Sequence, residues 1–407
     1  MKSSAGPGGT GGPLSAPSRA DAISVLKHSS YMPSIGGGEM QTHAIGRAMR
    51  RAGIRVRVID TRGEGPRNTC QRLDGIPVLR YTTPGLPILD TLVQQVRLRH
   101  LLRRLLPSCD LVQVNHLSTA LIPAYIMARS RRRPLLVLLW GSCRPGIGPF
   151  RRGWRWALLR ALARRADHVL ALSDGMAASL RDDWGFAPDR LEVIPNGVDI
   201  TRFKPRRDLT PPSPLQGKGP VVISVGRLVP AKRYDLLIQA WSQVCRQQLE
   251  GHLVILGEGP LRRDLEALIQ SLHLGSRVSL PGEVPGVQDW LSAAAVYVSS
   301  SDTEGMSNAI LEALASALPV IATRVSGSTD LIQHGQQGLL VERDSPDALV
   351  GSIQRLLADT DERRRLGRNA RARIVQSFSL EAVAARYQAT YRRLSGRDNQ
   401  PHRQRSA

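Results

Sequence analysis

Two pairs of charged side chains could act together on a phosphate and a sugar. Arg227 and Lys232 are cations that follow an apolar run, and Glu304 and Glu312 are carboxylates eight positions apart, with Gly305 after the first. Fixed positive charge neutralises phosphate oxygens, whereas a carboxylate can accept hydrogen bonds from two neighbouring hydroxyls of a ribose or a hexose. The pattern therefore predicts a site for a phosphorylated sugar compound.

Glycines cluster around these charged residues and in one segment near the N-terminus. A residue without a Cβ lets backbone N–H groups approach a phosphate closely. Ser307 or Asn308 is the expected N-cap of a helix whose first amides could hold a pyrophosphate. The candidate binding residues of these segments are Gly36, Gly37, Gly226, Gly259, Gly305, Met306, Ser307, Asn308 and Glu312.

Short apolar runs alternate with longer helical patterns along the chain, which predicts parallel sheets covered by helices. Ligands of such sheets bind outside the carboxyl ends of the strands, and the charged residues in the second half follow expected strands. The strands expected in the first half are Ile23–Leu26, Ile54–Ile59, Leu111–Val114, Leu135–Leu139, His168–Leu172 and Leu191–Ile194. Those expected in the second half are Val221–Val225, Leu253–Leu256, Val278–Leu280, Val296–Ser299, Val320–Ala322 and Leu339–Val341.

The fold class that this order predicts is α/β, with two doubly wound domains joined by a hinge. A proline-rich segment separates the two sets of strands, and the last patterned stretch is an amphipathic helix. The expected divisions are a disordered leader at 1–20, the first domain at 21–203, a linker at 204–219, the second domain at 220–378, the final helix at 379–394 and a disordered tail at 395–407.

The chain has 407 residues and a formal net charge of +22 at pH 7. Residues 1–205 hold 31 Lys and Arg against 14 Asp and Glu, whereas the remainder hold 25 against 20. An anionic partner is therefore expected mainly at the first half. The stretch 150–165 interleaves arginines with Trp and Leu, which favours docking on an anionic membrane surface, with an ordinary solvated face as the alternative. Nucleic acid is not an expected partner, because no recognised nucleic-acid-binding motif accompanies the charge.

The cysteines and the N-terminus indicate the compartment. Cys70, Cys109, Cys143 and Cys245 are scattered without metal-ligand spacing, which favours a reducing environment and no metal site. The first residues are rich in Gly, Ser and Pro and lack the apolar region of a signal peptide. We expect a cytoplasmic protein that is peripheral on the cytoplasmic membrane face.

Residues 304–315 (EGMSNAILEALA) and the following PVIAT at 319–323 resemble the retaining glycosyltransferases of the GT-B fold. The group is family four, or group 1, whose mark is two glutamates eight positions apart. Residues 225–232 are similar to its phosphate-binding Arg and Lys pair, residues 194–205 to its domain-junction signature, and residues 33–39 to its N-terminal Gly-Gly loop. The resemblance spans most of the chain. It implies the GT-B architecture, in which two Rossmann-like domains face a central cleft and the final helix, a crossover helix at 379–394, returns to the first domain.

The resemblance implies transfer of a hexose-type sugar, with retention, from a nucleoside-diphosphate sugar to a hydroxyl of a saccharide or lipid-linked acceptor. It implies a role in polysaccharide or glycolipid biosynthesis, with the donor as co-substrate and neither a further cofactor nor a divalent metal. The catalytic residues that it implies are Arg227 and Lys232, which would neutralise the departing diphosphate, and Glu304, which would contact the donor sugar. Glu312 would contact the ribose.

Several residues depart from the resemblance, among them Ala317, Ser326 and Asp330, and one further departure keeps other functions open. Trp140 stands where the family often has a histidine, after a strand of the first domain, whereas Gly36 and Gly37 fit the loop that closes over the donor phosphates. The alternatives are an epimerase-type nucleotide-sugar enzyme of the same fold and a non-catalytic protein that binds a sugar nucleotide or a membrane. Donor turnover with and without an acceptor separates the three.

Overall fold

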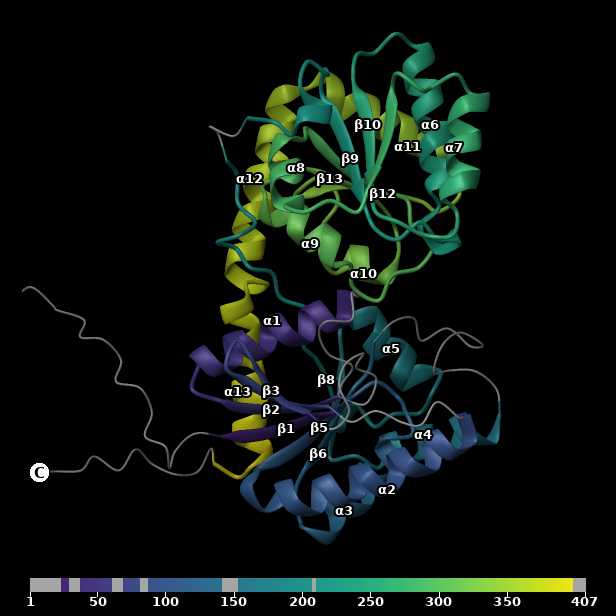
Figure 1. Ribbon diagram of the computed structural model, residues 1–407. Helices are drawn as coiled ribbons and strands as arrows, with labels where there is room; N and C mark the ends of the chain where they lie inside the picture. The colour runs from purple at the N-terminus through teal and green to yellow at the C-terminus, as the bar shows by residue number, and fades with distance from the viewer. Residues whose placement is uncertain are drawn as a thin grey trace, which may run out of the picture.

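The computed structural model describes residues 23–28, 37–60, 69–80, 87–140, 153–206 and 210–397. These residues form two α/β domains, one above the other in Figure 1, and each domain has its own sheet with helices around it. This arrangement confirms the predicted fold class. The expected leader, Gly36, residues 150–152 and most of the expected tail lie outside the described residues.

The first sheet has eight strands in the order β3-β4-β2-β1-β5-β6-β7-β8. Its strands pair in parallel except β3, which runs antiparallel to β4. The strands are β1 (Ser24–His28), β2 (Arg55–Asp60), β3 (Thr69–Leu73), β4 (Ile76–Arg80), β5 (Leu111–Asn115), β6 (Leu135–Leu138), β7 (His168–Ala171) and β8 (Leu191–Val193). The helices of this domain are α1 (Gly37–Arg51), α2 (Pro87–Leu105), α3 (Leu121–Ser130), α4 (Trp154–Arg164) and α5 (Asp174–Asp182).

The second sheet is wholly parallel, with six strands in the order β11-β10-β9-β12-β13-β14. The strands are β9 (Val221–Val225), β10 (His252–Leu256), β11 (Val278–Gly282), β12 (Val296–Ser299), β13 (Val320–Thr323) and β14 (Gly338–Val341). The helices that follow them are α6 (Tyr234–Arg246), α7 (Arg262–Ser271), α8 (Val287–Ala293), α9 (Asn308–Ala315), α10 (Ser326–Thr329), α11 (Pro346–Ala358), α12 (Thr360–Ser377) and α13 (Leu380–Leu394).

All twelve expected strands are present within two residues of their predicted ends, and two further strands were not predicted. The extra pair, β3 and β4, is a hairpin whose turn contains Asp74 (φ 48°) and Gly75 (φ 77°). Two consecutive residues with positive φ make the tight turn that matches the twist of paired strands. This hairpin forms one edge of the first sheet.

The chain crosses between the domains twice, and the two crossings pair with each other. Val198 donates its N–H to the carbonyl of Phe378 at 2.9 Å, and Leu380 donates to the carbonyl of Val198 at 3.1 Å. Ser379 caps α13 by accepting a hydrogen bond from the N–H of Ala382 at 3.2 Å. Helix α13 then packs along α1 and contributes Tyr387 to the first core, so it crosses back as expected (Figure 1).

In the described ranges, no helix has both the length and the apolar character needed to cross a membrane.

Candidate active site

A cavity of about 540 Å³ lies between the two domains, at the carboxyl ends of both sheets. In the first sheet β1 lies between β2 and β5, and in the second β9 lies between β10 and β12. The order of the strands reverses at these central strands, and loops that leave in opposite directions open a crevice there. The cavity is therefore where the topology of each domain favours a ligand.

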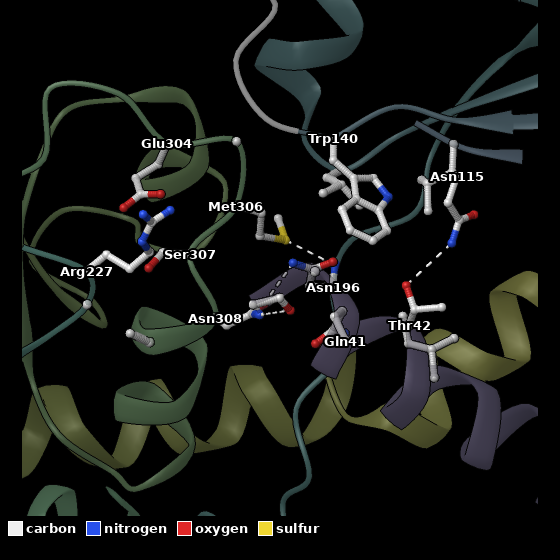
Figure 2. A pocket seen from close by; sticks show the side chains of 18 of the residues that line it. Gln41, Thr42, Asn115, Trp140, Asn196, Arg227, Glu304, Met306, Ser307 and Asn308 are labelled. Carbon is white, nitrogen blue, oxygen red and sulfur yellow. Dashed lines mark hydrogen bonds between the residues drawn. The ribbon is translucent and has the colours of Figure 1, made fainter. Parts of the chain in front are cut away.

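The second domain supplies cations to the cavity wall. Gly226 and Arg227 follow β9, and Lys232 ends the short 3-10 turn Pro230–Lys232 that precedes α6. Arg227 is exposed, and its guanidinium forms no ion pair or hydrogen bond with a described residue. Figure 2 shows the guanidinium of Arg227 and the carboxylate of Glu304 facing each other on the same side of the cavity. A guanidinium without a protein partner is available to a ligand phosphate.

Lys232 and Glu304 form an ion pair, and the hydroxyl of Ser301 donates a second hydrogen bond to the same carboxylate oxygen at 3.0 Å. The loop that carries Lys232 is fixed by the next residue. Arg233 has a left-handed backbone (φ 48°), and its guanidinium bonds to Asp344 at 2.5 Å. Lys232 and Glu304 are thus held in place before any ligand binds.

Two helix N-termini point at the cavity, one from each domain. Helix α1 begins at Gly37, and helix α9 begins at Asn308, with both residues in the cavity wall. Ser307 is the N-cap of α9, since its hydroxyl accepts a hydrogen bond from the N–H of Ile310 at 3.4 Å, as expected. The partial positive charge at both helix starts favours an anion between them.

Asn308 ties the two domains together beside the cavity. Its side-chain amide donates to the carbonyl of Gly37 at 2.9 Å, and its side-chain oxygen accepts from the amide of Asn196 at 2.8 Å. The sulfur of Met306 accepts a hydrogen bond from the N–H of Asn196 at 3.2 Å. Figure 2 shows Met306, Asn196 and Asn308 side by side in the middle of the cavity wall. The loop after β12 therefore positions the first domain as well as the ligand side chains.

Most of the predicted site residues come together at this cavity. Those in its wall are Gly37, Gly226, Arg227, Lys232, Glu304, Gly305, Met306, Ser307 and Asn308. Two predicted residues, Gly259 and Glu312, lie elsewhere, and Gly36 is outside the described residues.

Glu312 does not share the cavity of Glu304. Glu304 stands in the loop before α9, whereas Glu312 is on the helix and lines a second cavity of about 150 Å³. Burial raises the pKa of Glu312 to about 7, and the charge of Arg202 acts in the opposite direction. The two cavities adjoin, because Gln41 and Asn308 line both. The contact of Glu312 with a ribose stays a prediction that would require the nucleoside to reach the second cavity.

Gly259 serves the packing of two loops. A Cβ at this position would lie 2.4 Å from the carbonyl oxygen of Leu228, so only glycine allows the loop after β10 to lie against the loop after β9. Gly257 has φ 134°, and a Cβ there would lie 2.1 Å from the carbonyl oxygen of Gly226. Gly259 lets these backbones approach and does not line the cavity, so its contact with a ligand stays a prediction.

The first domain contributes a polar wall that the sequence analysis did not identify. It consists of Lys27 on β1, Gln113 and Asn115 on β5, and Thr42 on α1, all lining the cavity. A lysine within a buried five-residue strand, and two amides in another, are signals that could have marked them. Only the pairing of β1 with β5 brings them together.

Trp140 forms part of the same wall. A Cβ on Gly38 would lie 1.9 Å from the indole ring, so the start of α1 rests directly against the tryptophan. The imidazole ring of His116 lies against the indole ring of Trp140, with the two ring centroids 3.9 Å apart. Trp140 therefore shapes the cavity and lines it without a titratable group.

Two family models match the chain. One described as "Glycosyl transferases group 1" matches residues 205–373, and one described as "Glycosyltransferase Family 4" matches residues 35–202. Together they account for both domains and for the loops that form the cavity.

Curated relatives match about half of the chain. WcaL of Escherichia coli, described as a putative colanic acid biosynthesis glycosyltransferase, is 34% identical over 234 residues, 54% of this chain and 55% of that protein. A GDP-mannose-dependent alpha-(1-6)-phosphatidylinositol monomannoside mannosyltransferase of Mycobacterium tuberculosis is 30% identical over 245 residues, 56% of this chain and 63% of the relative. The chain thus spans little more than half the length of these relatives.

Solved structures share the fold over nearly the whole chain. HepE of Anabaena, solved in complex with UDP and glucose, superposes with a TM-score of 0.73 and 23% identity, and the match covers 90% of this chain and 99% of HepE. At this level of identity the likeness establishes the architecture. The two family models, the relatives and the shared architecture lead to one conclusion: the chain belongs to the group 1 glycosyltransferases, which have the GT-B fold.

Proposed function

We propose that the protein moves a hexose-type sugar from a nucleoside diphosphate to a hydroxyl of a saccharide or lipid-linked acceptor, with retention at the anomeric carbon. The observation that carries the proposal is the convergence of Arg227, the Lys232–Glu304 pair and two helix N-termini on one cavity. The names of relatives support a role in surface polysaccharide or glycolipid assembly, and HepE was solved with UDP and glucose.

The charges in the cavity suit the departure of a diphosphate. As the bond between the anomeric carbon and the phosphate oxygen breaks, negative charge grows on that oxygen, and Arg227 and Lys232 stabilise it. The acceptor oxygen bonds to the same face of the anomeric carbon, and its proton goes to the departing phosphate oxygen. No divalent metal is needed in this scheme, because side chains and helix N-termini supply the positive charge.

Glu304 acts in this proposal as a binding group for sugar hydroxyls. Its carboxylate already accepts hydrogen bonds from Lys232 and Ser301, and this reduces its strength as a nucleophile toward carbon. A free oxygen of the carboxylate remains able to accept a hydrogen bond from the donor sugar. Retention is therefore assigned to attack on the same face, without a covalent sugar–enzyme intermediate.

The proposal is tested by measuring nucleotide release from UDP-, GDP- and ADP-hexoses with and without acceptors such as crude glycolipid or oligosaccharide. We expect one donor to be turned over, with release that depends on an acceptor and is lost in Arg227→Gln. Conversion of the donor sugar without an acceptor would indicate an epimerase. Binding of the donor without nucleotide release under any of these conditions would indicate a non-catalytic protein.

We also propose that helix α4 docks on an anionic membrane on the cytoplasmic side. Trp154 is 77% exposed and Leu158, one turn later, is 44% exposed, with Arg155 exposed between them. Arg164 and Arg165 at the end of the helix are also exposed. Large apolar side chains flanked by arginines suit the interface of a membrane that carries anionic lipids.

Vesicle flotation tests this docking. The wild-type protein should float with phosphatidylglycerol vesicles at low salt and should not float with phosphatidylcholine vesicles. The double variant Trp154→Ser, Leu158→Ser should lose flotation. Val375→Ser removes another exposed apolar side chain, from α12 of the second domain, and should leave flotation unchanged. Equal flotation of the double variant would contradict the proposal.

A further inference from the structure

Lys27 lies in a part of the cavity that the donor charges do not use. It lies opposite Gln113 in the pairing of β1 with β5, so the two side chains are on the same face of the first sheet. Asn115, two residues after Gln113 on β5, is on that face as well, because side chains alternate along a strand. All three line the cavity on the side of the first domain. Figure 2 shows Asn115 and Thr42 on the opposite side of the cavity from Arg227 and Glu304.

Lys27 is a buried cation without an acidic partner. Its relative exposure is 2%, and its ammonium lies over the rings of Tyr387 and Tyr391, 5.1 and 5.9 Å from their centroids. No Asp or Glu among the described residues forms an ion pair with it. Burial lowers the pKa of Lys27 to about 7, while burial raises the pKa of both tyrosines, which stay neutral. A buried ammonium of this kind is stabilised when an anion reaches it.

The polar groups around Lys27 are arranged as a chain that ends in donors. The hydroxyl of Tyr391 donates to the side-chain oxygen of Gln113, whose amide donates to the oxygen of Asn115 at 2.6 Å. The amide of Asn115 donates to the hydroxyl of Thr42 at 3.4 Å. Each oxygen in the chain accepts one hydrogen bond, and the Thr42 hydroxyl and one N–H on each amide remain able to donate.

Trp140 adds a further donor to this wall. Its indole N–H is buried and has no hydrogen-bond partner among the described residues. A wall of unsatisfied donors around a cation complements a ligand group that carries negative charge and several acceptor oxygens. A neutral sugar hydroxyl would gain no such charge-assisted hydrogen bond from Lys27.

We propose that Lys27, with Asn115 and Thr42, forms an acceptor subsite that binds a carboxylate or phosphate group on the acceptor molecule. The inference rests on the proposed function, since it assigns the first-domain side of the cavity to the acceptor. It adds that the acceptor is acidic, and it makes Lys27 a specificity-determining residue. The donor diphosphate contacts the other side of the cavity, through Arg227 and Lys232.

Calorimetry on the full chain saturated with UDP tests the subsite with three probes: methyl glucoside, methyl glucuronide and inorganic phosphate. We expect the glucuronide to bind about tenfold or more tightly than the glucoside, because one charge-assisted hydrogen bond raises the affinity by about this factor. Lys27→Met, which keeps the length of the side chain, should abolish this preference. Lys218→Met removes an exposed lysine and should keep it. If inorganic phosphate binds more tightly than the glucuronide, the charged group of the acceptor is a phosphate and not a carboxylate.

Two controls separate folding and donor binding from the subsite. Lys27→Met should melt at or above the wild-type temperature, because it removes a buried ammonium, and it should bind UDP as the wild type does. At pH 8, glucuronide binding should take up protons in the wild type and none in Lys27→Met, since a bound anion recharges Lys27.

The outcomes are decisive in each direction. Absence of any preference for the charged probes in the wild type overturns the acidic-acceptor inference, and so does an unchanged preference in Lys27→Met. If UDP fails to bind while the Lys27-dependent preference persists, the proposed function fails and the anion subsite stands. If UDP binds and the preference is absent, only the subsite fails.

Discussion

Lys232 and Glu304, 72 positions apart, form an ion pair that joins the loop after β9 to the loop after β12. The two loops flank the switch point of the second sheet, and Ser301 donates a further hydrogen bond to the same carboxylate. The pair fixes a cation next to a carboxylate at a distance set by the fold. Such fixed charges lower an activation barrier without reorganising during the reaction.

Neutralising either member of this pair should slow sugar transfer. We expect Lys232→Met and Glu304→Gln each to lower kcat/KM by about a hundredfold or more, on the order of 3 kcal/mol of transition-state stabilisation. Steady-state nucleotide release measures the effect, and Lys218→Met, at an exposed site, serves as the control. Wild-type rates in both variants would remove this pair from the active site.

Asn308 should control how firmly the domains close on the donor. Asn308→Ala removes the hydrogen bonds to Gly37 and Asn196, and we expect the donor to bind about tenfold more weakly. Calorimetry with the nucleotide measures this. Asn369→Ala is a matched control, because its amide donates to the carbonyl of Gln336 within the second domain. Equal losses of affinity in the two variants would contradict a role in closure.

Glu312 should lower the stability of the protein at high pH. Burial raises its pKa from an ordinary 4.5 to about 7, so the folded state binds a proton that the unfolded state has released between these values. The cost is absent below pH 4.5 and complete above pH 7, where it amounts to roughly 3 kcal/mol. Glu312→Gln should therefore melt higher than the wild type at pH 8 and equally at pH 4. A constant difference across this range would show that charge is not the cause.

Glu192 should anchor α13 to the first domain with the opposite dependence on pH. Although burial acts to raise its pKa, hydrogen bonds from His168, Thr390 and Arg393 lower it to about 2. The stabilisation is present above pH 4.5 and is lost as the pH falls through 2. We expect Glu192→Gln to cost roughly 1–3 kcal/mol at pH 7 by thermal or urea unfolding.

The matched control for this anchor is on the same helix. Glu381 is 62% exposed and lies 3.7 Å from Arg51, so Glu381→Gln should change stability little. If the two variants unfold alike at pH 7, the contacts of Glu192 do not hold α13 in place.

The second-domain half of the site was predictable because its residues follow their strands directly along the chain. Gly226, Arg227 and Glu304 come within a few residues of strand ends, so a local pattern places them at the same edge. Lys27 and Gln113 stand inside strands 86 positions apart, and their contact with one cavity depends on strand pairing that no local pattern encodes.

The expected N-cap at Ser307 or Asn308 puts Glu304 before the helix and Glu312 on it, and α9 begins at Asn308 as this requires. That Glu312 lines a second cavity depends on the packing of the first domain, which no local pattern encodes. The turn of the hairpin was detectable, since Asp74-Gly75 before the apolar strand β4 is a strong turn signal. Its first strand, TCQRL, is largely polar and does not read as a strand by hydrophobicity.

Calorimetric titration of UDP, GDP and ADP into the wild type and Arg227→Gln tests the central claim most directly. If the cavity is the donor site, one of these nucleotides binds the wild type, and the variant binds it about tenfold or more weakly, because a charge-assisted contact to phosphate is lost. Equal affinity in Arg227→Gln, or no binding of any of the three to the wild type, would contradict the assignment of this cavity to a nucleotide-sugar donor.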